Sequence, residues 1–328
     1  MTKLAVRVAV AICAMLLLAS FPRVSLAEDF PSRPITWVVG FPPGGVSDTG
    51  TRYMAKHFSE KLGQPVIVEN KPGAGGIIAA EYVAAAKADG YTIMYGASGP
   101  LASFKSLYKK LSYDPIKSFT LIHGFVQSPL LLAVPASSRF KTLQDLVDFG
   151  KKNPGKLNFG SVGSGSGAHL VAELLASNAG ISMTHVPYKG SAQAITEMLG
   201  GNLDLIFDYS IVLKPQIDAG KLRALTVTGP GRLVSHPDVP TTTELGFPGV
   251  QLTAWATLVG PAGMPQPIVD LMAKAFNETL KDPAVVKFHN DLGMTLMPDV
   301  AGTKLRDFIV DEQARWKEVI VRTGASAD

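Results

Sequence analysis

Serine and histidine side chains gather in one glycine-rich stretch of the sequence, Gly160–His169. Ser164 or Ser166 could act as a nucleophile with His169 as the base, if an aspartate such as Asp208 oriented that histidine. The same hydroxyls could instead donate hydrogen bonds to a carboxylate, and the histidine could pack or cap a helix. The residue types alone leave a hydrolase open, but they favour an anion-binding site.

Signatures of other reaction classes are weak or missing in this sequence. Gly163-x-Gly165-x-x-Ala168 matches a relaxed dinucleotide fingerprint, but no clear acidic residue ends a second strand at the expected distance. No lysine stands where a P-loop requires one, and no Gly-x-Ser-x-Gly elbow occurs. The other histidines are scattered without paired metal-ligand spacing: His57, His123, His185, His236 and His289. We therefore expect no catalytic residue, no cofactor and no metal.

Two further glycine loops could bind anions. They span Phe41–Asp48 and Asn70–Gly76, and each precedes a segment with helical spacing. A helix that opens from such a loop directs free backbone N–H groups and the positive end of its dipole at one point. Ser47 or Asp48 could equally cap the following helix, and the second loop could be a turn only.

The glycine loops stand between predicted strands and predicted helices. Short β-branched or apolar runs predict strands at Ile35–Val39, Pro65–Glu69, Tyr91–Tyr95, Leu157–Ser161, Leu203–Phe207 and Leu222–Thr228. Helical spacing predicts helices at Ser47–Leu62, Ile77–Lys87, Ala168–Ala179 and Ser191–Leu199. This alternation predicts an α/β fold with parallel-type sheets that helices flank on both faces.

The length of 328 residues exceeds what one hydrophobic core usually serves, so we expect two lobes. The tail from Pro267 is mainly helical and has too few strands to fold alone. We predict a discontinuous first lobe, residues 28–127 plus 251–328, and a second lobe, residues 128–250. The chain would cross near 125–135 and 251–260, and the two lobes would close on a ligand in the cleft between them.

The N-terminus has the pattern of a cleaved signal peptide, residues 1–27. A basic start precedes an apolar run, residues 8–19, which is shorter than the roughly 20 residues of a membrane-spanning helix. Loss of Lys3, Arg7 and Arg23 lowers the formal net charge from +4 to +1, and Cys13 leaves with the peptide. We therefore expect an exported, periplasmic protein, and its near-neutral charge gives no support for nucleic-acid binding.

Several motifs closely resemble those of the extracytoplasmic solute receptors of tripartite tricarboxylate transporters, the Bug family. They occur in one order through nearly all of the mature chain: Phe41–Asp48, Val68–Gly76, Asp89–Tyr91, Tyr113–Pro115, Gly160–His169, Val186–Gly190, Val239–Gly246 and Gly260–Pro265. The resemblance implies a two-lobed type II periplasmic binding fold, of the Venus-flytrap kind, with a small organic acid held between the lobes.

The resemblance also implies which residues bind the ligand. In similar proteins backbone amides, small hydroxyls and bridging waters of the first and third loops hold a carboxylate. Carried onto this chain, these are Phe41, Pro42, Gly45, Val46, Ser47 and Asp48 from the first loop, and Ser161, Gly163, Gly165, Ser166 and His169 from the third. Candidates for the far end of the pocket are Ser98, Tyr188, Asp208 and Trp255. The chain departs from the pattern of many members at Phe104-Lys105, which weakens inference of the substrate from relatives.

The expected function is binding of a ligand without any reaction on that ligand. The protein would be a monomeric periplasmic receptor that binds a di- or tricarboxylate or an aromatic carboxylate and delivers it to the membrane subunits of a tripartite tricarboxylate transporter. The alternatives are a secreted serine hydrolase, and a sensor that binds the same ligand for signalling.

Overall fold

The computed structural model describes residues 30–163, 166–188 and 190–323. The predicted signal peptide and the candidate residue Gly165 lie outside these ranges. The chain divides into a first unit, Met1–Ser32, and a second unit, Arg33–Asp328, which carries every element below. Within the described ranges, no helix combines the length and the apolar character needed to cross a membrane.

The first half of the sheet joins strands from both ends of the sequence. In spatial order they are β2 (Val66–Asn70), β1 (Ile35–Val39), β3 (Thr92–Ala97), β9 (Thr253–Pro261) and β4 (Phe119–Pro135). β1 is parallel to β2 and β3, whereas β9 is antiparallel to both β3 and β4. The short strand β10 (Thr295–Leu296) also pairs with β4.

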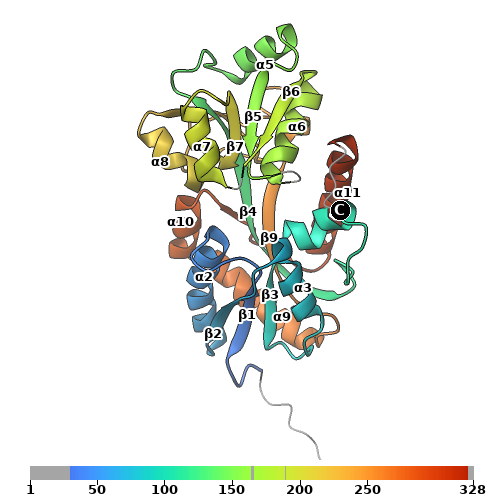
Figure 1. Cartoon of the computed structure of the whole chain (residues 1–328). Helices are drawn as coiled ribbons and strands as arrows, with labels where there is room; N and C mark the ends of the chain where they lie inside the picture. Colours follow the sequence, from blue (N-terminus) through green and yellow to red (C-terminus); the bar gives the residue numbers. More distant parts are fainter. Residues whose placement is uncertain (1–29, 164–165, 189, 324–328) are drawn as a thin grey trace, which may run out of the picture. The chain divides into compact units, whose positions relative to one another are not determined.

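The long strand β4 continues into the second half of the sheet. It pairs with β9 as far as Pro129 and then, from Leu130, with β7 (Leu205–Tyr209). β8 (Leu222–Val227) pairs with β4 as well, and beyond β7 follow β5 (Leu157–Ser161) and β6 (Met183–Pro187). β5 is parallel to β6 and β7. Figure 1 shows β4 and β9 side by side between the two groups of helices.

The helices lie against both faces of the sheet (Figure 1). Those near the first half are α2 (Val46–Leu62), α3 (Ile77–Ala84), α4 (Phe104–Leu107), α9 (Gln266–Leu280) and α10 (Pro283–Asp291). Those near the second half are α5 (Leu143–Lys152), α6 (Gly167–Ala179), α7 (Ser191–Leu199) and α8 (Ser210–Asp218). Single helical turns are η1 (Ala74–Gly76), η2 (Gly99–Ser103) and η3 (Pro248–Val250). The C-terminal helix α11 (Gly302–Thr323) contacts η2, α4 and α6.

Four aromatic side chains from distant parts of the sequence form the core of the first half. Trp37 of β1 contacts Phe58 of α2, Phe125 of β4 and Phe276 of α9, with ring centroids 5.7–6.2 Å apart. All four are fully buried or nearly so. Aromatic pairs at such separations contribute beyond the area they bury. The mainly helical tail therefore completes the core of the first half, because α9 supplies one of these rings.

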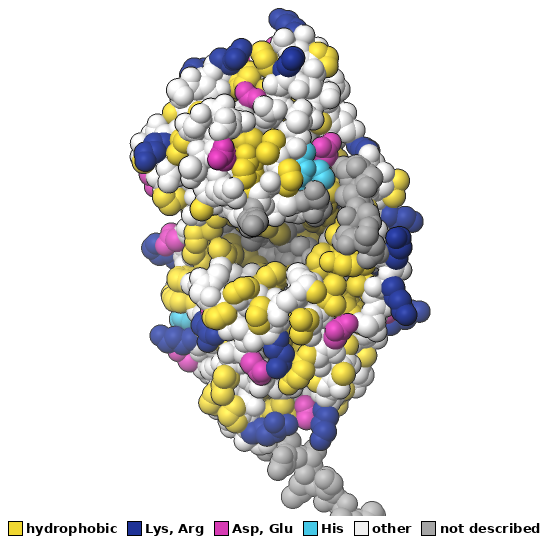
Figure 2. Space-filling model, in the orientation of Figure 1, with side chains coloured by type: hydrophobic (Ala, Val, Ile, Leu, Met, Phe, Trp, Pro, Cys, Tyr) yellow, Lys and Arg dark blue, Asp and Glu magenta, His cyan; other side chains and the backbone are white. Residues whose placement is uncertain are grey.

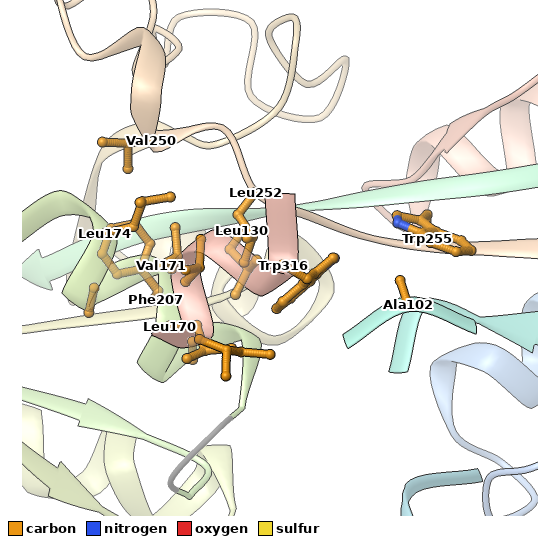
Figure 3. Close-up of a cluster of buried hydrophobic side chains, with 14 of the residues drawn as sticks. Ala102, Leu130, Leu170, Val171, Leu174, Phe207, Val250, Leu252, Trp255 and Trp316 are labelled. Atoms are coloured by element: carbon orange, nitrogen blue, oxygen red, sulfur yellow. The ribbon is translucent and has the colours of Figure 1, made fainter. Parts of the chain in front are cut away.

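A continuous apolar cluster links the two halves. Trp316 of α11 lies among side chains of β4 and α6, with Leu130, Leu170 and Val171 nearby (Figure 3). The same cluster includes Val38 of β1. The helix α11 is therefore packed against elements of both halves of the sheet.

The observed fold agrees with the predicted α/β class and refines its sheets. The expectation of parallel sheets holds for β1, β2, β3, β5, β6 and β7, but β4 and β9 are antiparallel to their neighbours, so the sheet is mixed. Both predicted crossings, residues 125–135 and 251–260, fall largely within these two strands. The second unit does not divide further by its contacts, so the lobe boundaries stay a prediction.

Candidate functional site

A cavity of about 550 Å³ lies where the ends of several elements meet. It is lined by Phe41, Val46, Ser47, Gly75, Tyr95, Ala97, Ser98, Gly99, Ser103, Phe104, Ser128, Val162, Ser166, Gly167, Tyr209, Ile211, Ala254, Trp255, Leu292, Gly293, Met294 and Trp316. Among the described residues, none that lines it is Lys, Arg, His, Asp or Glu. Figure 2 shows a hollow across one face of the molecule with hydrophobic side chains along it.

The first loop approaches the cavity with the N-terminus of α2. Gly45 is the N-cap residue, so Val46 and Ser47 are the first residues of the helix, where amides have no intrahelical acceptor. The Ser47 side chain forms a hydrogen bond with Tyr95 of β3. Burial raises the pKa of Tyr95 and the bond to Ser47 opposes that shift, so the tyrosine is a neutral hydrogen-bonding group at ordinary pH.

Asp48 stabilises the conformation of the first loop through hydrogen bonds. Its carboxylate accepts hydrogen bonds from Gly44 N at 2.8 Å, from Arg52 Nε at 3.0 Å and from Asn70 Nδ2 at 2.8 Å. Asn70 also donates to Phe41 O at 3.0 Å. Burial raises the pKa of Asp48, but these bonds outweigh burial and hold it below its usual value. Asp48 is thus an ionised group that orders the loop.

The third loop presents the N-terminus of α6. Ser166 is the N-cap residue: its hydroxyl accepts from His169 N at 3.3 Å and donates to Gly163 O at 2.7 Å. Ser161 is buried and lies 2.6 Å from His185 Nε2 through its hydroxyl oxygen. Ser166 and Gly167 line the cavity, so α6 begins at the same space as α2, and the N-terminal end of a helix dipole favours an anion.

Three stacked rings support the third loop. The ring centroids of His169 and His185 are 4.0 Å apart, and that of Phe159 on β5 is 4.9 Å from His185. Burial and the neighbouring His185 lower the pKa of His169 to about 4, and burial lowers that of His185. Both imidazoles are therefore neutral at ordinary pH. His169 serves as packing beneath the loop, which is one of the roles the sequence left open.

The carboxyl end of β7 contributes an acid and a phenol. Asp208 is buried and accepts hydrogen bonds from Tyr209 N at 2.8 Å and from the Ser191 side chain at the start of α7. Burial raises the pKa of Asp208 against these bonds. Burial also raises the pKa of Tyr209, and the charges of Asp208 and Tyr95 raise it further. Tyr209 lines the cavity, whereas Asp208 does not.

Aromatic side chains form another part of the cavity lining. Trp255 of β9 and Trp316 of α11 are 2% and 4% exposed, and Trp255 Nε1 donates to Glu312 at 2.8 Å. Phe104 of α4 lies against Gly75 and Gly99, where a Cβ atom would come within 2.8 Å of its ring. Both positions therefore require glycine for Phe104 to reach the cavity.

The predicted site residues divide into those that line the cavity and those that do not. Lining residues are Phe41, Val46, Ser47, Ser98, Ser166 and Trp255. Pro42, Gly45, Asp48, Ser161, Gly163, His169, Tyr188 and Asp208 do not line it. Pro42 and Gly45 are exposed in the first loop, and Tyr188 N donates to Ser161 O at 2.8 Å. A role in binding stays a prediction for all of them.

Several lining residues were missed from the sequence: Tyr95, Ser103, Phe104, Ser128, Ile211, Ala254 and Trp316. Phe104 could have been found from the sequence, because the chain departs from the family pattern at Phe104-Lys105. No feature of the sequence indicated that Trp316 lines a cavity, since an apolar residue at helical spacing predicts only a buried helix face.

Metal binding finds no support in the part of the chain that the structure describes. No group of three His, Cys, Asp or Glu side chains within those ranges could hold an ion.

Comparison with known proteins decides the family. Residues 51–325 match the family described as tripartite tricarboxylate transporter family receptor. The chain belongs to this receptor family. Proteins similar to it include a UPF0065 protein from the tcbD-tcbE intergenic region of Pseudomonas sp. strain P51, 36% identical over 96% of this chain and 94% of that protein. Protein BugT of Bordetella pertussis is 35% identical over 91% of this chain and 92% of its own.

Solved structures of such receptors agree with the fold. Rpa4515 of R. palustris with adipate is 32% identical with a TM-score of 0.78, covering 91% of this chain and 99% of that one. MatC from Rhodopseudomonas palustris with bound malate is 33% identical with a TM-score of 0.72, covering 89% and 100%. The resemblance inferred from the motifs and the periplasmic binding fold are confirmed. The family consists of solute receptors without catalytic activity, so the hydrolase alternative is rejected.

Proposed function

We propose that this receptor holds a small organic carboxylate between the N-termini of α2 and α6. The observation that carries the proposal is that both helices begin at one cavity, with a serine at the start of each. First-turn amides and hydroxyls donate hydrogen bonds to an anion, and two helix dipoles favour it there. The relatives with adipate and malate support an acid as the ligand class.

The predicted lobes give this cavity a way to close. We assign residues 28–127 plus 251–328 to one lobe and residues 128–250 to the other, with β4 and β9 as the two crossings. The support is that α2 follows β1 in the first half of the sheet, whereas α6 follows β5 in the second. A ligand that contacts both helix N-termini would then favour the closed arrangement, because only closure satisfies both sets of donors.

We further propose that the receptor is exported by a signal peptide at residues 1–27 and acts in the periplasm as a monomer. It would deliver its ligand to the membrane subunits of a tripartite tricarboxylate transporter, with no part for nucleic acid. The support is the family itself, together with the near-neutral charge that remains after loss of the leader.

Calorimetric titration of the purified receptor against small organic acids tests the carboxylate grip. We expect Ser47→Ala and Ser166→Ala each to weaken binding about 10- to 100-fold, because each variant removes a hydroxyl that lines the cavity beside a helix N-terminus. Ser137→Ala is the matched control, since Ser137 is exposed in the loop between β4 and α5. Binding of neutral sugars but of no acid would reject the proposal.

A further inference from the structure

The loop that follows α10 contacts the start of α8 beside the cavity. Gly293 is buried, and a Cβ atom at this position would lie 2.4 Å from Ser210 Cβ and 2.8 Å from Ser210 Oγ. Carbon atoms in ordinary contact lie about 3.5–4.0 Å apart, so this arrangement leaves no room for a side chain on Gly293. Figure 1 shows α8 and α10 on the same side of β4. Both segments also line the cavity, through Met294 and Ile211, so the contact borders the ligand space.

Both sides of this contact are fixed by neighbouring structure. Gly293 N donates to Asn290 O at 2.9 Å, and the loop then enters β10, which pairs with β4. Ser210 is 1% exposed, and its Oγ lies 3.1 Å from Ser235 Oγ and 3.2 Å from His236 Nδ1. The Ser210 Cβ atom is bonded to the backbone, so rotation of the side chain does not move it. A clash at this point is therefore relieved by moving the two segments apart.

The close approach distinguishes Gly293 from other glycines that end helices. Its φ of 72° lies in the left-handed region, as do those of Gly63 at 69° and Gly180 at 66°, which end α2 and α6. A Cβ atom at either of those two positions would meet no described atom within 4 Å. Gly63 and Gly180 thus serve a helix end alone, whereas Gly293 also allows two distant segments to meet.

We infer that Gly293 and Ser210 form the contact across which the two proposed lobes close on the ligand. Gly293 belongs to the lobe that includes residues 251–328, and Ser210 belongs to the lobe 128–250. The inference rests on the proposed function and adds a positioning residue to it. A side chain on Gly293 would separate the lobes here by about 1 Å or more, so the N-termini of α2 and α6 would no longer reach one ligand together. A receptor that closes less often binds its ligand more weakly in proportion.

Calorimetric titration of the purified receptor with malate, adipate, citrate and benzoate tests this contact. For the acid that the wild type binds most tightly, we expect Gly293→Ala to raise the dissociation constant about 10-fold or more. Gly63→Ala is the matched control, because it introduces the same side chain at nearly the same φ but in open space. That variant should keep the dissociation constant within about twofold of wild type, since its strain is local. If no acid binds the wild type, the proposed function and this inference fail together.

Second substitutions at Ser210 separate a steric contact from a general loss of structure. Without the Ser210 Cβ and Oγ atoms, the nearest atom to the added Cβ would be Ser210 Cα at 3.6 Å, which is an ordinary contact. Gly293→Ala/Ser210→Gly should therefore bind within about threefold of Ser210→Gly alone. Gly293→Ala/Ser210→Ala loses the same hydroxyl but keeps the Cβ atom, so its binding should stay weak.

Ser210→Val tests the contact without changing the left-handed residue. It enlarges the side chain opposite Gly293, and we expect binding about 10-fold weaker than that of Ser210→Ala, which also lacks the hydroxyl. Equal affinities of these two variants would count against the inference. Wild-type affinity of Gly293→Ala, or equal restoration by Ser210→Gly and Ser210→Ala, would overturn it and leave the carboxylate-binding function intact.

Discussion

At the scale of single residues, the site depends on side chains that do not face the cavity. Asp48 joins Gly44, Arg52 and Asn70, and Asn70 in turn binds Phe41. These bonds fix the loop that presents Val46 and Ser47. A charged hydrogen-bonding centre behind a binding loop orders the donors before the ligand arrives, which lowers the entropy lost on binding.

Asp48→Asn tests this ordering role. An amide cannot accept the Arg52 and backbone bonds as a carboxylate does, so we expect a loss of about 1–3 kcal/mol in the free energy of unfolding at pH 7, measured by urea denaturation. Because the folded pKa of Asp48 is lowered, its contribution is present above the unfolded pKa and disappears as the pH falls through the folded value. The difference between variant and wild type should therefore shrink as the pH falls below 3.8.

Asp307→Asn is the matched control for that measurement. Asp307 is an exposed residue of α11, and the substitution should change stability by less than about 0.5 kcal/mol. A wild-type-like stability of Asp48→Asn at pH 7 would show that the loop does not depend on this carboxylate.

At the scale of elements, the start of α6 rests on two neutral histidines. His169 belongs to α6 and His185 to β6, and the stack with Phe159 joins them to β5. Neutral imidazoles can stack closely without repulsion, but two imidazolium ions at that distance would repel each other. Protonation of both rings would therefore weaken the packing that supports the third loop.

Acid should destabilise this arrangement. The folded pKa of His169 is about 4, below the unfolded value of 6.5, so the unfolded chain takes up protons first as the pH falls. We expect His169 alone to lower the free energy of unfolding by about 1–2 kcal/mol between pH 7 and pH 5. His169→Gln should show a smaller fall over this range in urea denaturation.

The same two proteins compared at pH 8 provide the control for His169→Gln. Both folded and unfolded histidines are neutral there, so the remaining difference reports packing alone. An identical fall in the free energy of unfolding between pH 7 and pH 5 in both proteins would show that His169 is not the source of the acid sensitivity.

The elements that the sequence predicted best are those with a local signal. Ile35–Val39, Leu157–Ser161 and Ser191–Leu199 were placed at their observed bounds, because turn residues and periodicity delimit them. The strand expected at Leu203–Phe207 begins two residues later, at Leu205. Its end matters more, because the observed strand reaches Tyr209 and so brings that side chain to the cavity.

Long-range pairing was beyond the sequence. Residues 125–135 were expected as a crossing, and they belong to the strand β4, Phe119–Pro135, whose backbone pairs with β9, β7 and β8 in turn. A local pattern cannot show which strand lies beside it or in which direction. For the same reason the motifs marked the glycine loops, but the aromatic wall formed by α4, β9 and α11 was largely missed.

At the scale of the whole molecule, one apolar cluster includes residues from both halves of the sheet. Trp316 of α11 belongs to it, as do Val38 of β1 and Phe207 of β7. A shared cluster couples the two halves, since neither can lose its packing without exposing the other. In the proposed two-lobe arrangement, closure would be limited by how much of this cluster stays in contact.

Trp316→Ala tests the coupling. Removal of a nearly fully buried tryptophan should lower the free energy of unfolding by about 3–5 kcal/mol. Wild type should unfold in one urea transition by both fluorescence and circular dichroism, and the variant should approach two. Val321→Ala, an exposed position on the same helix, is the control. Separate transitions already in the wild type would contradict the coupling.

The place of β9 between β3 and β4 also sets an order for folding. Met94 of β3 pairs with Val259 of β9, so this edge of β3 has no partner until most of the polypeptide has emerged. An unpaired strand edge can associate with other chains, and pairing between such distant segments is slow. β1, β2 and β3 therefore pass through a period of exposure that ends only when residues 253–261 arrive, and aggregation during biogenesis should be most sensitive to substitutions in that late strand.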